Sequence, residues 1–247
     1  MQTLWPRICN KEGIETNGSS LLEHMVGQTL TVTTKWSLQE YWRKVKKLGS
    51  LLGDEQDVIM RKTHANSALR SLKENWLKRK GLSTKTRIRL YNSLVKPILL
   101  YNAGTWGFSA TDNDNLDSFH RDHLRRTLAS KWHSRLSSRT VYVRTSSKPI
   151  SLEITECRWR LFGHILRIDL DAPANAAMED YFEAGGHRFR GRPRNNLPGT
   201  LDRDLKRTGK ELKDGDDLDA LRDVAQNRGK WNKLITRIVS CAAQALS

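Results

Sequence analysis

Apolar side chains recur every three or four residues through much of the chain beyond residue 50, which is the spacing of one face of an α-helix. The first such run comprises Val58, Ala65, Leu69, Leu72 and Trp76. Asp54 stands where an N-cap belongs, and Gly81 follows a basic turn, as a glycine just beyond a helix end does. The pattern therefore predicts a helix from about residue 54 to residue 80.

Two more helices are predicted before residue 130. In the first, Ser83 is placed to cap the N-terminus, and Pro97, which lacks an amide hydrogen, predicts a kink or an early end. We assign its apolar face to Leu90, Leu94, Ile98 and Tyr101, opposite Lys85, Arg89, Asn92 and Lys96. The other helix runs from about residue 111 to residue 128. Its apolar half holds Leu116, Phe119, His120, Leu124 and Leu128, and its other half holds Arg121 and Arg125.

The second half of the chain continues the helical pattern. A short helix is predicted around Val141. A longer one runs from Pro149 to about Ile168, and its apolar residues surround the axis as in a buried helix. Further helical patches lie near 198–208 and 216–239. Since no pattern alternates strands with helices, the fold class expected is all-α.

The net charge of the chain indicates what kind of partner it binds. The 247 residues carry 43 Lys and Arg against 27 Asp and Glu, giving a net charge of +16. Such an excess predicts attraction to a polyanion, nucleic acid first and an acidic membrane surface second. No window reaches the ~18 apolar residues needed to cross a bilayer. The N-terminus lacks a signal-peptide pattern and the three cysteines lie far apart, so a nuclear or cytoplasmic protein is expected, not a secreted one.

Four stretches of the chain, taken in order, carry a resemblance to a known family. They are "KKLGSLLGDEQDVIMRKTHANSALRSL", "LSTKTRIRLYNSLVKPILLYNAGTWG", "LFGHILRI", and "RGRPRNN" followed by "ALRDVAQNRGKWNKLI". Over about residues 45–238 they resemble the C-terminal part of non-LTR (LINE-type) retrotransposon reverse transcriptases. In that family this part is the helical thumb, just after the catalytic palm, together with the region downstream.

The helical pattern and the resemblance together divide the chain into five segments. They are a loosely structured segment at 1–47, a thumb-like helical bundle at 48–130, a second helical region at 131–183, a basic linker at 184–199 and C-terminal helices at 200–247. In the family the catalytic aspartates lie upstream of the element matched by Leu48–Ser50, and residues 1–47 hold no paired aspartate. We therefore expect no catalytic residues, no cofactor and no polymerase activity from this chain alone.

Gly215-Asp216-Asp217 spells a triplet that can mark a polymerase, in which paired carboxylates hold two metal ions. A rigid metal site of that kind needs apolar strands on both sides of the pair, yet here a helical pattern follows. Acidic side chains at a helix start interact favourably with the helix dipole and with the free amide groups. We therefore interpret the triplet as the start of a helix.

Two histidines raise the question of a metal site. His120-x-x-His123, with Asp117 one turn earlier, could supply part of a zinc site on a helix. A structural zinc site usually needs further cysteine or histidine ligands, and no Cys-x-x-Cys pair accompanies these residues. Packing against the core is the favoured interpretation, and no metal is expected.

The residues expected to bind nucleic acid lie in a basic turn, on two helices and in an arginine-rich stretch. Cations on a helical face suit a surface that grips nucleic acid by its backbone. The candidates are Lys78, Arg79, Lys80, Lys85, Arg89, Lys96, Arg121, Arg125, Arg188, Arg190, Arg192 and Arg194. The partner expected is RNA, DNA or their hybrid, bound without sequence preference, and no membrane. The function expected is that of a truncated retrotransposon-derived fragment that binds nucleic acid.

Two alternatives stay open. Arg190-Gly191-Arg192-Pro193 resembles the core of an AT-hook, in which arginines enter a narrow A·T minor groove. On that interpretation the chain is a DNA-binding chromatin protein. The other alternative is an inert helical fragment or interaction module, whose cationic stripes are only solvated surface.

Overall fold

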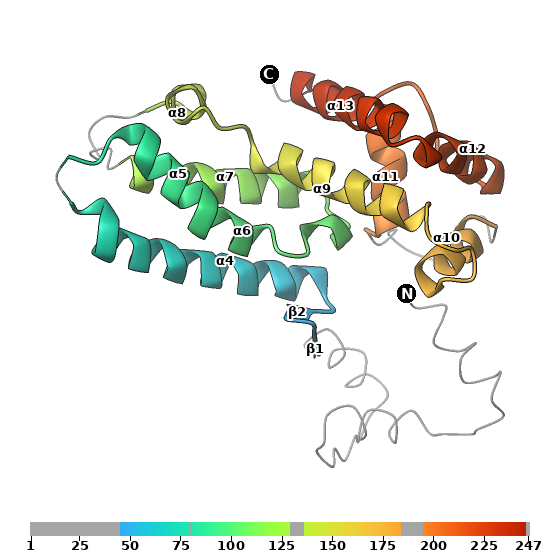
Figure 1. Cartoon of the computed structure of the whole chain (residues 1–247), viewed down its shortest axis with the longest axis horizontal. Helices are drawn as coiled ribbons and strands as arrows, with labels where there is room; N and C mark the ends of the chain where they lie inside the picture. Colours follow the sequence, from blue (N-terminus) through green and yellow to red (C-terminus); the bar gives the residue numbers. More distant parts are fainter. Residues whose placement is uncertain (1–44, 80, 129–135, 184–194, 246–247) are drawn as a thin grey trace, which may run out of the picture.

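The computed structural model describes residues 45–79, 81–128, 136–183 and 195–245, and helices make up nearly all of the regular structure there (Figure 1). The strands of the described part form one short antiparallel hairpin, in which β1 (Lys46–Lys47) pairs with β2 (Ser50–Leu51). The expected all-α class is therefore confirmed.

The helices follow one another in three groups. The first comprises α4 (Asp54–Leu72), the π-helix η2 (Lys73–Leu77), α5 (Thr84–Leu94), α6 (Lys96–Leu99), the 3₁₀ turn η3 (Ala103–Thr105), α7 (Ala110–Thr127) and α8 (Ser138–Thr145). A single helix, α9 (Ile150–Ile165), forms the second group. The last comprises α10 (Pro173–Glu183), α11 (Leu197–Lys206), α12 (Gly215–Gln226) and α13 (Arg228–Gln244). Figure 1 shows α9 running between the first group and the last.

Helix α9 belongs to two hydrophobic cores at once. Its N-terminal half places Ile150 and Ile154 in a core formed with α4 to α8. Its C-terminal half places Trp159, Phe162 and Ile165 in a core formed with α10 to α13. A helix with neighbours on several sides has little solvent-facing surface, so apolar residues surround its axis. The predicted buried helix is confirmed.

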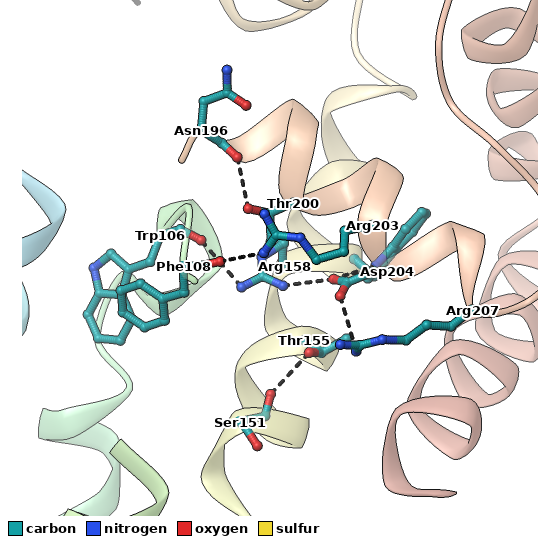
Figure 2. Close-up of polar contacts among 11 residues, drawn as sticks. Trp106, Phe108, Ser151, Thr155, Arg158, Asn196, Thr200, Arg203, Asp204 and Arg207 are labelled. Carbon is teal, nitrogen blue, oxygen red and sulfur yellow. Dashed lines mark hydrogen bonds and ion pairs between the residues drawn. The ribbon is translucent and has the colours of Figure 1, made fainter. Parts of the chain in front are cut away.

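A buried ion pair lies where the two cores meet. Arg158 on α9 is 2% exposed and donates from Nη1 to Oδ2 of Asp204 on α11 at 2.7 Å. Its Nη2 donates to the carbonyl oxygen of Trp106 at 3.3 Å. The indole Nε1 of Trp159 donates to the same Asp204 oxygen at 3.3 Å, and Arg207 lies 3.6 Å from Oδ1 (Figure 2). Asp204 thereby joins α11 to α9, while Arg158 links both to the loop after η3.

Side-chain caps start several helices near the predicted positions. Ser83 Oγ accepts a hydrogen bond from the Thr86 amide at 3.2 Å, which begins α5. Asp214 Oδ1 accepts one from the Asp217 amide at 3.0 Å, which begins α12. The predicted break falls at Val95, between α5 and α6, and Pro97 lies in the first turn of α6. Each cap satisfies an amide that has no partner within the helix.

The apolar face assigned to the second predicted helix is correct only in part, because Leu90 packs against the core but the fully buried positions lie one residue away from those assigned. The residues buried along α5 and α6 are Ile88, Tyr91, Val95 and Leu99. Leu94, which was expected in the core, is 50% exposed, and Tyr101 is exposed as well. Both sets recur at helical spacing, so periodicity alone cannot choose between them. In the structure Tyr91 is buried with its hydroxyl 2.9 Å from Nδ1 of His120 on α7, which satisfies its polar end.

This correction gives a matched pair of leucine substitutions. Leu99→Ala is expected to lower the free energy of unfolding by about 2–5 kcal/mol, because it opens a cavity in a packed core. Leu94→Ala removes the same atoms from a half-exposed position and is expected to cost less than about 1 kcal/mol. Urea denaturation of the two variants measures the difference. A larger loss of stability in Leu94→Ala than in Leu99→Ala would favour the face first assigned.

Two further features of the helices differ from the predictions. Helix α10 lies in a stretch for which no helix was predicted. The single patch expected over 216–239 is two helices, because Asn227 is extended and its Oδ1 accepts hydrogen bonds from the amides of Gly229 and Lys230, both at 3.0 Å. An asparagine inside a helical pattern can therefore end one helix and cap the next.

Candidate nucleic-acid interface

Exposed cations gather where α4 ends and α5 begins. We call this region the basic end, and it comprises Arg70, Lys73, Lys78, Arg79, Lys85 and Arg89, all exposed. Residues 70–94 hold eight Lys and Arg against a single acidic residue, Glu74. In Figure 1 this region forms one extremity of the molecule, where the ribbon turns from α4 into α5.

Most cations of the basic end have no carboxylate partner within the described residues. Lys78 pairs with Glu74 one turn earlier, and this contact lowers the pKa of the Glu74 carboxyl. The other five form no ion pair with a described carboxylate. Unneutralised cations on a convex surface attract phosphates and release the counterions condensed on nucleic acid.

An exposed tryptophan lies among these cations. Trp76 was expected on the apolar face of the first helix, but the structure leaves it 46% exposed. The cause is the π-helix η2, in which the Lys78 amide donates to the Lys73 carbonyl at 3.2 Å. The wider turn shifts the helical phase, so Leu77 is buried in place of Trp76. The guanidinium carbon of Arg79 lies 4.6 Å from the centre of the Trp76 ring.

Arg87, for which no role was predicted, connects the end of η2 to the start of α5. Arg87 on α5 turns inward, where Nη1 donates to the carbonyl oxygen of Leu77 at 2.8 Å and Nε donates to that of Leu82 at 3.2 Å. It thus satisfies a carbonyl at the end of η2 and fixes the start of α5 against it. Lys85 and Arg89, on either side of it in sequence, stay exposed. In the sequence, Lys85, Arg87 and Arg89 alternate with other residues, and this pattern does not show which of the three side chains points inward.

Three predicted binding residues are engaged inside the protein instead. Nζ of Lys96 lies 3.1 Å from a carboxylate oxygen of Glu153 on α9, and both side chains are largely buried. Arg121 is half-buried beside the Tyr142 hydroxyl, and Arg125 donates to the carbonyl oxygen of Leu136 at 3.3 Å. These residues stabilise the packing of α6, α7 and α8, and we leave them out of the interface.

The remaining candidates lie outside the described residues, and for them the binding role stays a prediction. They are Lys80, Arg188, Arg190, Arg192 and Arg194. The basic end therefore retains Lys78, Arg79, Lys85 and Arg89 from the sequence-based set and adds Arg70 and Lys73.

The opposite extremity of the protein is acidic. Residues 169–183, which include α10, hold five Asp and Glu and no Lys or Arg. Helix α10 contacts α12, whose first turn carries Asp216 and Asp217. Figure 1 places α10 and α12 at the far side of α9 from the α4–α5 turn. Residues 169–183 and the first turn of α12 therefore form an acidic region away from the basic end, while exposed cations such as Arg228 and Lys230 follow on α13.

The Gly215-Asp216-Asp217 triplet starts a helix, as predicted. Asp214 is the N-cap, and Oδ2 of Asp217 in turn accepts a hydrogen bond from the Lys213 amide at 2.9 Å. The two side chains thus satisfy amides on both sides of the helix start. Acidic side chains at this position also favour the helix dipole.

The two histidines of α7 are buried and hydrogen-bonded. Nδ1 of His120 lies 2.9 Å from the Tyr91 hydroxyl, and Nε2 of His123 lies 2.9 Å from Oδ1 of Asn66. Burial lowers the pKa of His120 to about 3 and that of His123 to about 4, with smaller contributions from nearby cations. Both rings are therefore neutral at physiological pH. Asp117, the third residue considered for a zinc site, accepts hydrogen bonds from the amide and the hydroxyl of Ser151.

Within the described ranges, no group of three or more His, Cys, Asp and Glu is arranged to hold a metal ion. No helix of that part of the chain combines the length and the apolar content that crossing a membrane requires. No protein-family model matches the chain, and neither a curated protein nor a solved structure is significantly similar to it.

Proposed function

We propose that this chain binds RNA or DNA without sequence preference through the basic end and does not polymerise nucleic acid by itself. The observation that carries the proposal is the group of exposed cations on one corner, five of which have no carboxylate partner in the described structure. The acidic α10–α12 extremity supports it, because repulsion there favours approach of a polyanion to the basic end.

The arrangement suits contacts with a sugar–phosphate backbone. Lys85 and Arg89 are one helical turn apart on α5, so their side chains lie on the same face. Lys73 lies in η2, and Lys78 and Arg79 lie in the turn just after it; Arg87 ties the end of η2 to α5. Contacts to phosphates position a protein on nucleic acid and carry no sequence information. The resemblance of residues 45–238 to the thumb and downstream region of retrotransposon reverse transcriptases favours the same function.

The experiment that tests the proposal removes four cations from the basic end. Arg70, Lys73, Lys85 and Arg89 are changed together to alanine, and binding to a duplex of mixed sequence is measured over a range of salt concentrations. For every phosphate that the variant no longer neutralises, the negative slope of log K against log salt is expected to become shallower by ~0.9. The affinity is expected to fall for all sequences alike.

A matched control removes the same charge elsewhere. Its four alanines replace Lys210, Arg228, Lys230 and Lys233, which are exposed in the C-terminal group of helices. This control is expected to keep most of the salt dependence of the parent. Equal effects of the two variants would show that net charge, and not the basic end, governs binding. A preference for A·T-rich duplexes that survives in the basic-end variant would favour the AT-hook alternative.

A further inference from the structure

We infer that Trp76 is a stacking platform for an unpaired base, so that the basic end prefers single-stranded nucleic acid to a closed duplex. This inference rests on the proposed function and names its ligand more closely. It combines three observations: an exposed indole, a guanidinium against that indole, and cations on both sides of it in the chain.

The exposure of Trp76 is a product of the local fold. Its neighbours Leu72 and Leu77 are buried at 3% and 5% exposure, so η2 is anchored on both sides of the tryptophan. A regular α-helix would place the side chain nearer the core, and the π-turn moves it outward. Scattered apolar side chains on a surface are common, but π-turns occur often at functional sites. The indole is therefore displayed on a fixed element.

The environment of the indole fits a nucleic-acid base. Arg79 lies over one side of the ring at 4.6 Å, and its backbone amide also donates to the Trp76 carbonyl at 3.1 Å. The guanidinium restricts the ring and remains exposed to contact a phosphate. No other aromatic ring of the described residues stacks on Trp76. Exposed ring surface beside Lys73 and Lys78 allows one base to stack while the flanking phosphates are neutralised.

Base stacking on an aromatic ring favours single-stranded nucleic acid over a duplex, a preference that charge alone does not give. In a duplex each base already stacks on its neighbours, and only the ends offer a free face. In a single strand every base offers one, and stacking on an aromatic side chain strengthens binding by about 5- to 150-fold for each base. Every base has such a face, so this preference is compatible with binding that ignores sequence.

The test compares two ligands that carry equal charge. The full chain is titrated with a thymidine dodecamer and with an abasic dodecamer that has the same number of phosphates. The parent is expected to bind the base-bearing strand at least about fivefold more tightly. Trp76→Leu, which keeps apolar bulk without a ring, is expected to abolish this ratio and leave binding of the abasic strand unchanged. Trp76→Phe is expected to retain part of the ratio.

The outcomes separate this inference from the proposed function. Equal binding of both dodecamers by the parent would overturn the stacking role, while the basic-end quadruple variant would still report on phosphate binding. Weaker binding of the abasic strand by Trp76→Leu would also overturn it, because the ring would then act through the fold. Thermal melts check that both variants fold. Displacement of the dodecamer by phosphatidylserine vesicles, abolished in Trp76→Leu, would assign the tryptophan to a lipid surface instead.

Discussion

Arg158→Met is expected to lower the free energy of unfolding by about 3–5 kcal/mol, the usual cost of removing one partner from a buried ion pair. The substitution leaves the Asp204 carboxylate, 5% exposed, with the Trp159 indole at 3.3 Å and the half-exposed Arg207 as its partners. It also frees the carbonyl of Trp106 from its hydrogen bond. Urea denaturation followed by circular dichroism measures the change in stability.

Arg160→Met is the matched control on the same helix. The Arg160 side chain is 68% exposed and pairs with Glu156, and exposed pairs of this kind contribute ~1 kcal/mol or less. A second variant, Arg158→Met with Asp204→Leu, removes both buried charges and is expected to recover much of the stability. If Arg158→Met cost no more than Arg160→Met, the ion pair would not hold the two cores together.

Gly163→Ala is expected to destabilise the protein by about 2–4 kcal/mol, although alanine is the better helix former by about 1 kcal/mol. An added methyl group would overlap the indole of Trp231, whose Cδ1 would lie only 2.8 Å from it. The indole cannot move aside freely, because it is buried and its Nε1 donates to the Trp159 carbonyl at 3.0 Å. The steric cost and the weakened hydrogen bond together outweigh the gain in helix propensity.

Gly215→Ala provides the comparison for this effect. Gly215 lies in the first turn of α12, and an added methyl group there would meet nothing within 4 Å. Its melting temperature is expected to equal or slightly exceed that of the parent. Thermal melts of both variants measure the effects. A Gly163→Ala protein that melts as high as the parent would mean that α13 does not pack against α9 at this glycine.

Local signals in the sequence predicted where α5 and α12 begin, but the N-cap expected at Asp54 is wrong, because Asp54 is the first residue of α4 and Gly53 precedes it without a side-chain cap. Ser83 and Asp214 cap helices because their short side chains reach amides three residues ahead, and that geometry needs no tertiary contact. The same reasoning identified the Gly215-Asp216-Asp217 triplet as a helix start. Apolar residues on several sides of α9 likewise predicted its burial, which the structure shows for most of the helix, with Arg160 and His164 left exposed.

Tertiary contacts decided what the sequence left open. Two apolar faces were available on α5, and the buried one includes Tyr91, whose hydroxyl pairs with His120, 29 residues away. Lys96 belongs to an ion pair with Glu153, 57 residues away, so its sequence neighbours give no hint of it. The π-turn that exposes Trp76 includes a hydrogen bond from the Lys78 amide to the Lys73 carbonyl, five residues back, and no residue preference specifies that pairing. The sequence therefore identified some cations of the candidate interface but placed Trp76 on the buried face of its helix.

The position of α9 between two cores also sets an order of events during synthesis. The partners of its first half, in α4 to α8, precede it in the chain, whereas Trp231 follows Trp159 by 72 residues. At about 5–20 residues per second, roughly 4–14 s pass before the ribosome delivers that tryptophan. During this interval the first core can close, while Trp159 and Phe162 still lack α13. During this interval the C-terminal half of α9 thus exposes an aromatic surface, the kind of surface that chaperones bind.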